Sequence, residues 1–280
     1  MKAPVIAVFA CSLAVLGLGG MASQPASPKE KAPSASGAPK PANTSCPIYK
    51  APIDPQVPVL VVEGTAIGFK TVGASREFNT WKPARKQAYA KRIRAGAEWS
   101  DPYVLGTCPI AGESLAEAES PVVHFHKGRQ FNFCCAGCVG AFEENPQKYI
   151  DQIDAEIIKT QARYYPLKTC LVSGEDLSEG AVDFVYGNRH VRLCCGGCLA
   201  ELQARPEKYL PTLNKAIVEA QRKDYPLTHC LVMPDDPIDE DGHAHEVVVG
   251  NRLLMLCCEG CETALRDSPA KYIEKLDRAR

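Results

Sequence analysis

A cysteine-rich stretch that recurs along the chain limits what this sequence can fold into. HVRLCCGGC occupies residues 190–198, and close copies occur as RQFNFCCAGC at 129–138 and RLLMLCCEGC at 252–261. A further cysteine precedes each copy, and these three cysteines are 62 and 60 residues apart. A period of this length indicates tandem repeats, each one a small supersecondary unit.

Three complete copies of this pattern follow one another, at residues 101–163, 164–223 and 224–280. Each contains a cysteine, an apolar run, a turn, the cysteine cluster and a Pro-x-Lys-Tyr element, such as PEKY at 206–209. The recurrence of all these parts in the same order predicts three equivalent repeats rather than a chance gathering of cysteines.

A fourth, degenerate copy is predicted at residues 45–100. The stretch EGTAIGFKTVGASREF aligns there with KGRQFNFCCAGCVGAF of the first complete copy, and Cys46 aligns with Cys108. We expect the fold of the repeat to persist in this copy and its thiol chemistry to be lost. The residues at the three clustered cysteine positions are Lys70, Thr71 and Ala74.

Local patterns within a copy predict a β-hairpin followed by helices. Short runs of strand-forming residues flank a Gly-Asn or Lys-Gly pair, and such pairs form tight hairpin turns. In the second complete copy, for example, residues 183–186 are predicted to pair with residues 190–194. Behind the cysteine turn, apolar residues recur at helical spacing, for example Ile150, Ile153 and Ile157. The predicted fold class is therefore α+β, with tandem small repeats of zinc-finger-like plan: a hairpin and a cysteine knuckle followed by helices.

Composition supports small units held together by cysteine chemistry. The chain has 14 cysteines and only 7% aromatic residues, and a unit of about sixty residues has a marginal core that gains from bound metal or disulfides. A formal net charge of -1 over 280 residues gives no argument for nucleic acid or a charged membrane surface as a partner. The sequence shows no serine–histidine–carboxylate arrangement and no phosphate-binding glycine loop, so we expect no catalysis.

The N-terminus predicts export. Residues 1–22 have the layout of a secretory signal peptide, with Lys2 before an uncharged apolar run and small residues up to Ala22. An uncleaved membrane anchor is the alternative, because the run is nearly long enough to span a bilayer. Residues 23–44 are rich in proline, alanine and serine and predict a disordered linker. We therefore expect a periplasmic or extracellular protein, in contact with a membrane only through an uncleaved N-terminal segment.

Each complete copy offers four cysteines as metal ligands. One precedes the hairpin, two end its returning strand, and the fourth begins a helix, where backbone amides and the helix dipole favour the thiolate. Thiolates select soft metals, so Zn²⁺ and Cu⁺ are the expected ions. The twelve candidate ligands are Cys108, Cys134, Cys135, Cys138, Cys170, Cys194, Cys195, Cys198, Cys230, Cys257, Cys258 and Cys261.

Two other uses of these cysteines stay open. Export to an oxidising compartment favours disulfides, which would make the protein an extracytoplasmic interaction scaffold, although adjacent cysteines make awkward bridges. The C-x-x-C pairs that open helices, such as Cys195 to Cys198, also occur in thiol–disulfide oxidoreductases. Each copy is too short for the fold of those enzymes and shows no βαβ pattern, which favours metal binding.

Histidines are the remaining candidate ligands. His124 and His126 alternate along a predicted strand, as do His243 and His245, so each pair could face one side of its hairpin. Such pairs could supplement a thiolate site, although strand histidines face solvent more often than they bind metal. The sequence leaves both interpretations open.

These motifs resemble the TRASH/YHS-type heavy-metal-binding domains. The stretches FNFCCAGC…AFEENPQKYI and RLCCGGC…PEKYL carry the resemblance, which covers residues 101–280 well and residues 45–100 faintly. In that family a cysteine is followed, after a long gap, by Cys-x-x-x-Cys, with an aromatic-rich strand before it and a Phe…Pro-x-Lys-Tyr tail behind it. Cys108, Cys134 and Cys138 match these three positions, as do their equivalents in the other two complete copies.

The resemblance implies a role in metal trafficking, buffering or resistance. The partner that it implies is a metal ion, and a protein that takes part in metal delivery is a further candidate partner. One departure concerns the second cysteine of each cluster, at a position where the family often has serine. The cysteines there, which would add a fourth ligand or only a reactive neighbour, are Cys135, Cys195 and Cys258.

Overall fold

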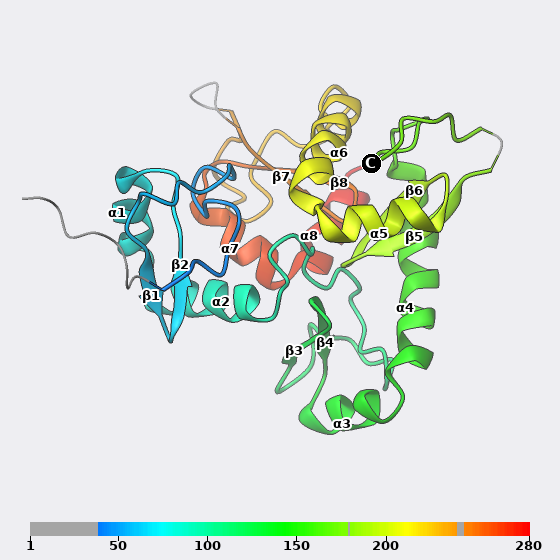
Figure 1. Cartoon of the computed structure of the whole chain (residues 1–280). Coiled ribbons are helices and arrows are strands. Elements are labelled where there is room, and N and C mark those ends of the chain that lie inside the picture. The colour runs from blue at the N-terminus through cyan, green and yellow to red at the C-terminus, as the bar shows by residue number, and fades with distance from the viewer. Residues whose placement is uncertain (1–38, 179, 240–243) are drawn as a thin grey trace, which may run out of the picture. The chain divides into compact units, whose positions relative to one another are not determined.

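A computed structural model describes residues 39–178, 180–239 and 244–280 of the chain (Figure 1). The predicted signal peptide, and the predicted linker up to residue 38, lie outside the described residues. Within those residues, no helix is both long enough and apolar enough to cross a bilayer. Asn43, near the end of the predicted linker, is buried, and its side chain forms two hydrogen bonds with the backbone of Gly68, the residue that follows the first hairpin.

The described residues form four successive units, each an antiparallel two-stranded hairpin followed by two helices (Figure 1). This mixed architecture of tandem repeats with cysteine clusters confirms the predicted α+β fold class. The first is the degenerate unit, and the other three, here called repeats 1, 2 and 3, are the complete copies. The elements are β1 (Leu60–Val62), β2 (Thr65–Ile67), α1 (Val72–Thr80) and α2 (Pro83–Arg94); β3 (Val122–His126), β4 (Arg129–Phe133), α3 (Ala136–Glu144), α4 (Pro146–Gln161) and the short η1 (Ala162–Tyr164); β5 (Val182–Tyr186), β6 (Arg189–Leu193), α5 (Gly196–Ala204) and α6 (Pro206–Gln221); β7 (His245–Val249), β8 (Arg252–Leu256), α7 (Gly260–Asp267) and α8 (Pro269–Arg278).

The hairpin turns depend on residues with a positive φ. Glu63 and Gly64 connect β1 to β2 with φ of 47° and 77°, and Lys127 and Gly128 connect β3 to β4 with φ of 48° and 77°. Two consecutive residues with positive φ form the turn that suits a two-residue hairpin loop. The degenerate unit and repeat 1 therefore share one turn, at the place where their sequences align.

The first helix of a unit begins beside the second clustered cysteine position. Cys135 and Cys195 are the extended N-cap residues of α3 and α5, and Thr71 is the N-cap of α1. The Thr71 hydroxyl accepts a hydrogen bond from the amide of Ala74 at 3.1 Å, which satisfies one free amide at the helix start. In the degenerate unit a threonine thus occupies the cap position that a cysteine occupies in repeats 1 and 2.

Each hairpin covers an apolar core with the helix that follows it. Phe78, Phe142, Leu202 and Leu265 stand at the same position of this helix in the successive units, and each is fully buried. Phe142 packs against Phe131 of β4, with ring centroids 4.8 Å apart. The cores of repeats 1 and 3 form one continuous apolar cluster, so these two repeats also stabilise one another.

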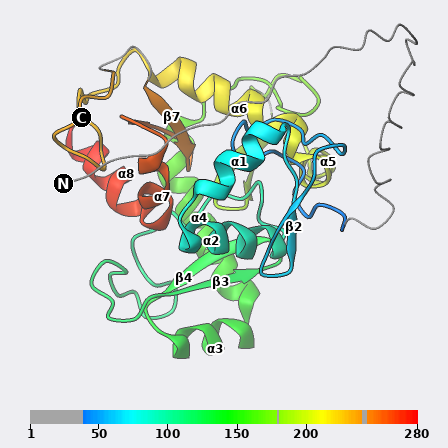
Figure 2. The ribbon, with the colours of Figure 1, turned by 90° about the vertical axis from the view of Figure 1, so that its left-hand side faces the viewer.

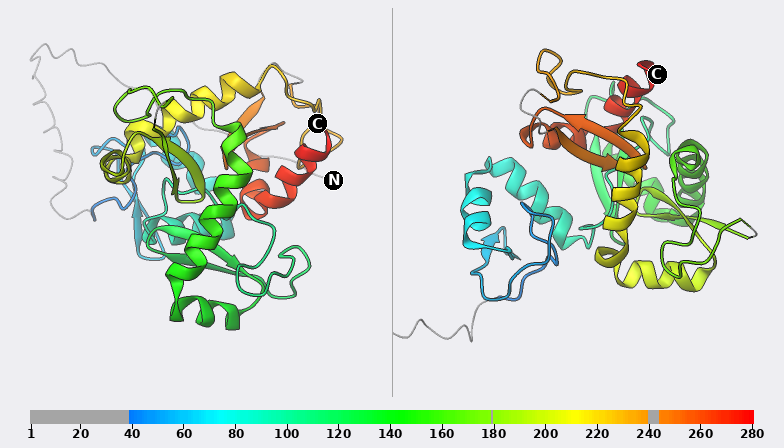
Figure 3. Two further views of the ribbon diagram at one scale, coloured as in Figure 1. Left: turned by 90° about the vertical axis from the view of Figure 1, so that its right-hand side faces the viewer. Right: turned by 90° about the horizontal axis from the view of Figure 1, so that it is seen from above.

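The second helix of repeats 1 and 2 packs against the hairpin of the next repeat. Helix α4 contacts β5 and β6, and α6 contacts β7 and β8, as Figure 3 shows. Gln161, at the end of α4, accepts a hydrogen bond from the amide of His190 at 2.9 Å and donates to the carbonyl of Asn188 at 3.0 Å. Gln221, at the end of α6, forms the equivalent two hydrogen bonds with the hairpin of repeat 3. One glutamine therefore fixes each long helix to its neighbour.

A buried carboxylate joins the three complete repeats. Asp101, before the hairpin of repeat 1, accepts two hydrogen bonds from the Arg189 guanidinium of repeat 2, at 2.8 and 2.9 Å. It also accepts one from the amide of Gly250 in repeat 3, at 2.7 Å. The side chains of Arg189 and Asp101 are only 6% and 7% exposed, so water weakens this ion pair little.

The degenerate unit contacts repeat 3, although two repeats separate them in the sequence. Arg85 of α2 forms an ion pair with Glu259, beside the start of α7, at 3.2 Å. Figure 2 shows α2 and α7 next to one another. The chain thus brings its first and last described units together.

Candidate metal centres

In each complete repeat, the cysteine before the hairpin meets two cysteines of the cluster. The three sulfur atoms of such a group, here called a cysteine triad, lie within 4.8 Å of one another, close enough for one metal ion to bind all three. Within the described residues the triads are Cys108, Cys134 and Cys138 in repeat 1; Cys170, Cys194 and Cys198 in repeat 2; and Cys230, Cys257 and Cys261 in repeat 3.

The hairpin and the first helix set the spacing within each triad. Cys134 directly follows β4 and Cys138 lies in the first turn of α3, with their sulfur atoms 3.6 Å apart. The corresponding distances are 3.4 Å in repeat 2 and 3.8 Å in repeat 3. Sulfur ligands at about 2.3 Å from a tetrahedral zinc ion are about 3.8 Å apart, whereas a disulfide bond measures about 2.05 Å. The sulfur positions therefore fit a shared ion better than a disulfide.

A tight turn presents the first cysteine of a triad to the cluster. In repeat 1, the amide of Gly112 donates to the carbonyl of Cys108 at 2.8 Å, and Gly112 has a φ of 72° that a glycine adopts easily. The degenerate unit keeps this turn, since the amide of Lys50 donates to the carbonyl of Cys46 at 2.9 Å. The turn is thus a feature of the repeat fold and persists where the cluster is missing.

Hydrogen bonds within this turn favour the ionised form of the first cysteine. Burial alone would raise the pKa of Cys170, but the hydroxyl and amide of Ser173 lower it to about 6. The amide of Ser173 lies 3.5 Å from the sulfur. Backbone amides likewise outweigh burial and lower the pKa of Cys108 and of Cys230. Each triad therefore contains one sulfur that ionises more readily than an ordinary cysteine, and the thiolate is the form that binds metal.

The other two sulfurs of each triad hold their protons more tightly. Burial raises the pKa of Cys138 and of Cys257 to about 11, and it also raises the pKa of Cys134, Cys198 and Cys261. A metal ion must displace these protons in order to bind. We therefore expect the affinity of a triad for metal to fall as the pH falls.

The second cysteine of each cluster lies beside its triad and outside it. Cys135, Cys195 and Cys258 are exposed, whereas the third cysteine of each cluster is buried. Their sulfurs lie 3.6, 3.8 and 3.9 Å from that third cysteine. The structure thus brings together nine of the twelve predicted ligands as triads and places the remaining three next to them, on the solvent side.

The degenerate unit fills the cluster positions with other groups. Cys46 is fully buried in the core of the unit together with Ala74, which stands at the third cluster position. Thr71 caps the helix, and Lys70 is exposed. Among the residues that the structure describes, none from this unit belongs to a group of three potential metal ligands.

A carboxylate joins the two strand histidines of repeat 1. Nε2 of His124 lies 2.6 Å from Oε1 of Glu143, and Nδ1 of His126 lies 3.2 Å from the same oxygen. The alternation of the histidines was visible in the sequence, but no local pattern relates them to an acidic residue at the end of the following helix. In repeat 3, His245 lies 3.0 Å from Glu262, and His243 is outside the described residues.

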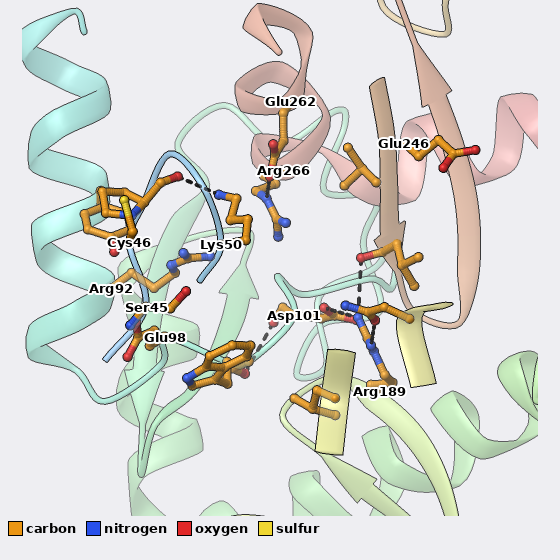
Figure 4. A pocket seen from close by; sticks show the side chains of 18 of the residues that line it. Ser45, Cys46, Lys50, Arg92, Glu98, Asp101, Arg189, Glu246, Glu262 and Arg266 are labelled. Carbon is orange, nitrogen blue, oxygen red and sulfur yellow. Dashed lines mark hydrogen bonds and ion pairs between the residues drawn. The ribbon is translucent and has the colours of Figure 1, made fainter. Parts of the chain in front are cut away.

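A cavity of about 230 Å³ lies where the degenerate unit meets repeats 2 and 3 (Figure 4). Charged side chains in its wall form ion pairs, among them Arg189 with Asp101 and Arg266 with Glu262. Of the cysteines in the described part of the chain, Cys46 alone lines this cavity. The cavity therefore lies between units, and none of the triad cysteines lines it.

Comparisons of the chain with known protein families, with curated proteins and with solved structures found no match. The functional argument therefore depends on the geometry and chemistry of the residues described above.

Proposed function

We propose that this protein binds a thiophilic metal ion, Zn²⁺ or Cu⁺, in each complete repeat. The observation that carries the proposal is the recurrence of one arrangement along the chain. A turn supplies one cysteine and the cluster supplies two, and their sulfurs lie within 4.8 Å of one another in repeats 1, 2 and 3. Sulfur ligands favour these two ions over Mg²⁺ or Ca²⁺, which bind oxygen.

The number of ligands bears on the choice between the two ions. Zn²⁺ in a structural site takes four ligands, so a triad would need one more. The exposed Cys135, Cys195 and Cys258 are near enough to supply it, and water or a partner protein would be alternatives. A site with only three protein ligands keeps one position open, which suits an ion that is passed on.

We further propose a role in metal trafficking, buffering or resistance outside the cytoplasm, and no catalytic role. The resemblance to TRASH/YHS-type domains and the predicted signal peptide support this role. The partners would be the metal ion and a protein that delivers or receives it. The exposed cysteine beside each triad would be the first sulfur that such a protein meets.

Metal analysis of the full chain, purified without oxygen, tests the proposal. We expect one zinc or copper ion per triad, three on the triads together, and thiols that react with a labelling reagent only after a chelator has removed the metal. Replacing both Cys194→Ser and Cys198→Ser should remove one ion. Cys46→Ser is the matched control, and it should leave the metal content unchanged.

Two outcomes would contradict the proposal. Unchanged metal content in the Cys194→Ser, Cys198→Ser protein would show that repeat 2 holds no ion on these sulfurs. A protein without metal and with few free thiols would support the disulfide scaffold instead, and the search would turn to protein partners.

A further inference from the structure

We propose that His124, His126 and Glu143 form a second kind of metal site on repeat 1, with nitrogen and oxygen ligands for a divalent ion such as Zn²⁺ or Cu²⁺. The three donor atoms lie within 4.8 Å of one another. Both imidazole nitrogens approach the same carboxylate oxygen, at 2.6 and 3.2 Å. This site, here called the histidine site, does not depend on metal in the cysteine triads.

Strand β3 and helix α3 hold the three side chains together. His124 and His126 are alternate residues of β3, so their side chains leave the strand on the same face. Glu143 lies near the end of α3, which packs against this hairpin. The buried Phe142 ring contacts both imidazoles, with centroids 6.1 and 5.5 Å away, and limits their rotation. The ligands are thus oriented before an ion binds, which lowers the entropy cost of binding.

The spacing and exposure of these groups suit an ion that also binds water. Nitrogen and oxygen ligands lie about 2.0–2.2 Å from Zn²⁺, so two ligands of a tetrahedral ion are about 3.3–3.5 Å apart. The N–O distances of 2.6 and 3.2 Å would therefore open by less than about 1 Å. The side chains of His124, His126 and Glu143 are 26%, 16% and 44% exposed, so an ion can enter from solvent and retain water ligands.

Repeats 2 and 3 show that the hairpin folds without these groups. An exposed ion pair between histidine and glutamate contributes little to stability, so stability alone does not explain why three ligands converge here. Neither of the other repeats has histidine, cysteine or a carboxylate at the three corresponding positions. The residues there are Phe184, Tyr186 and Gln203 in repeat 2 and Val247, Val249 and Arg266 in repeat 3.

The histidine site differs from the triads in the metals that it selects. Imidazole and carboxylate suit Zn²⁺, Ni²⁺ and Cu²⁺, whereas thiolates also bind Cu⁺. Repeat 1 would therefore carry two sites with different preferences: the thiolates of the triad favour Cu⁺, and the histidine site suits divalent ions such as Zn²⁺ and Cu²⁺.

Zinc titration by calorimetry, on the full chain without oxygen, tests this proposal. We expect the wild-type chain to bind one more ion than a protein with His124→Phe and His126→Tyr. If this variant still binds an ion at the histidine site, its affinity there should be at least about tenfold weaker than in the wild type. These substitutions introduce the residues that repeat 2 has at the same positions, so the hairpin should still fold. Glu143→Gln, which also follows repeat 2, should weaken the same step.

His245→Leu in repeat 3 is the matched control, since this histidine also lies beside a glutamate but belongs to no group of three potential metal ligands among the described residues. It should keep the extra ion, and the imidazole NMR signals of His124 and His126 should shift as that ion binds. Equal numbers of bound ions in the wild type and in the double histidine variant would overturn the proposal. Because the test compares these two proteins, it gives an answer even if the triads bind no metal.

Discussion

Within each cluster, the second cysteine differs from its neighbours in exposure and in acidity. Cys135, Cys195 and Cys258 are exposed. A hydrogen bond from the amide of the residue three positions later is the main reason why the pKa of Cys135 and of Cys195 is lowered. For Cys258 the same kind of bond outweighs burial. Of the three cysteines in a cluster, the second is therefore both the most accessible and the most readily ionised.

We expect alkylation of the metal-free protein to start at these three residues. The thiolate is the reacting form, so the rate rises as the pH passes the pKa. Because the pKa is lowered, the midpoint of this rise should lie below the ordinary value of 9.0. Mass spectrometry of peptides after brief treatment with iodoacetamide measures the order of labelling. Faster labelling of Cys134 or Cys138 than of Cys135 would contradict the expectation.

Ser173 controls the proton affinity of the repeat 2 triad. Its hydroxyl lowers the pKa of Cys170 and lies 3.3 Å from the sulfur of Cys194. The pKa of Cys194 is raised overall, and the hydrogen bond with this hydroxyl limits the rise. With Ser173→Ala both pKa values should rise, so protons should displace the metal at a higher pH than in the wild type. We expect one of three metal equivalents to leave earlier in an acid titration followed with a chelating dye. Ser178→Ala, an exposed residue of the same repeat, should leave the titration unchanged.

At the scale of elements, the turn between β5 and β6 requires a glycine. Gly187 has a φ of 61°, and a Cβ atom there would collide with Ser100. We expect Gly187→Ala to lower the free energy of unfolding by at least about 1–2 kcal/mol, the cost of a left-handed conformation for a residue with a side chain. Chemical denaturation followed by circular dichroism measures this change.

Gly196→Ala is the control for that experiment. Gly196 begins α5, a Cβ atom there would meet nothing within 4 Å, and repeat 1 has Ala136 at the same position. This substitution should leave stability unchanged or raise it slightly, because alanine favours helix. Equal losses at Gly187 and Gly196 would show that the turn geometry is not the cause.

The elements were predictable from the sequence because their signals are local. Lys127 and Gly128 mark a hairpin turn, and a proline such as Pro146 marks the start of a helix. The spacing of cysteines likewise predicted that sulfurs of each copy would gather, but it left open whether the second cysteine of the cluster would join them. The contacts of Asp101 with Arg189 join residues 88 positions apart, and no local pattern reveals them. Glu143 was missed for the same reason, since only the packing of α3 on β3 brings it to the histidines.

At the scale of the whole described chain, the Asp101–Arg189 ion pair connects repeats 1 and 2. Asp101→Ala would leave a buried guanidinium without its partner, which costs about 3–5 kcal/mol. We expect a loss of this size in the free energy of unfolding, measured by urea denaturation of the metal-free protein. Glu219→Gln removes a carboxylate from an exposed pair with Lys215 and should change stability by less than about 0.5 kcal/mol.

Contacts between units that are not neighbours in the sequence restrict how this protein can vary. In an open solenoid each repeat touches only the next, so evolution can add or delete copies at little cost. Here repeat 3 touches repeat 1 through Gly250 and Asp101, and it touches the degenerate unit through Glu259 and Arg85. Inserting or deleting one period would pull these partners apart. The number of cysteine triads in one molecule is therefore fixed by its architecture. Under the proposed function, more metal could be bound only by more molecules.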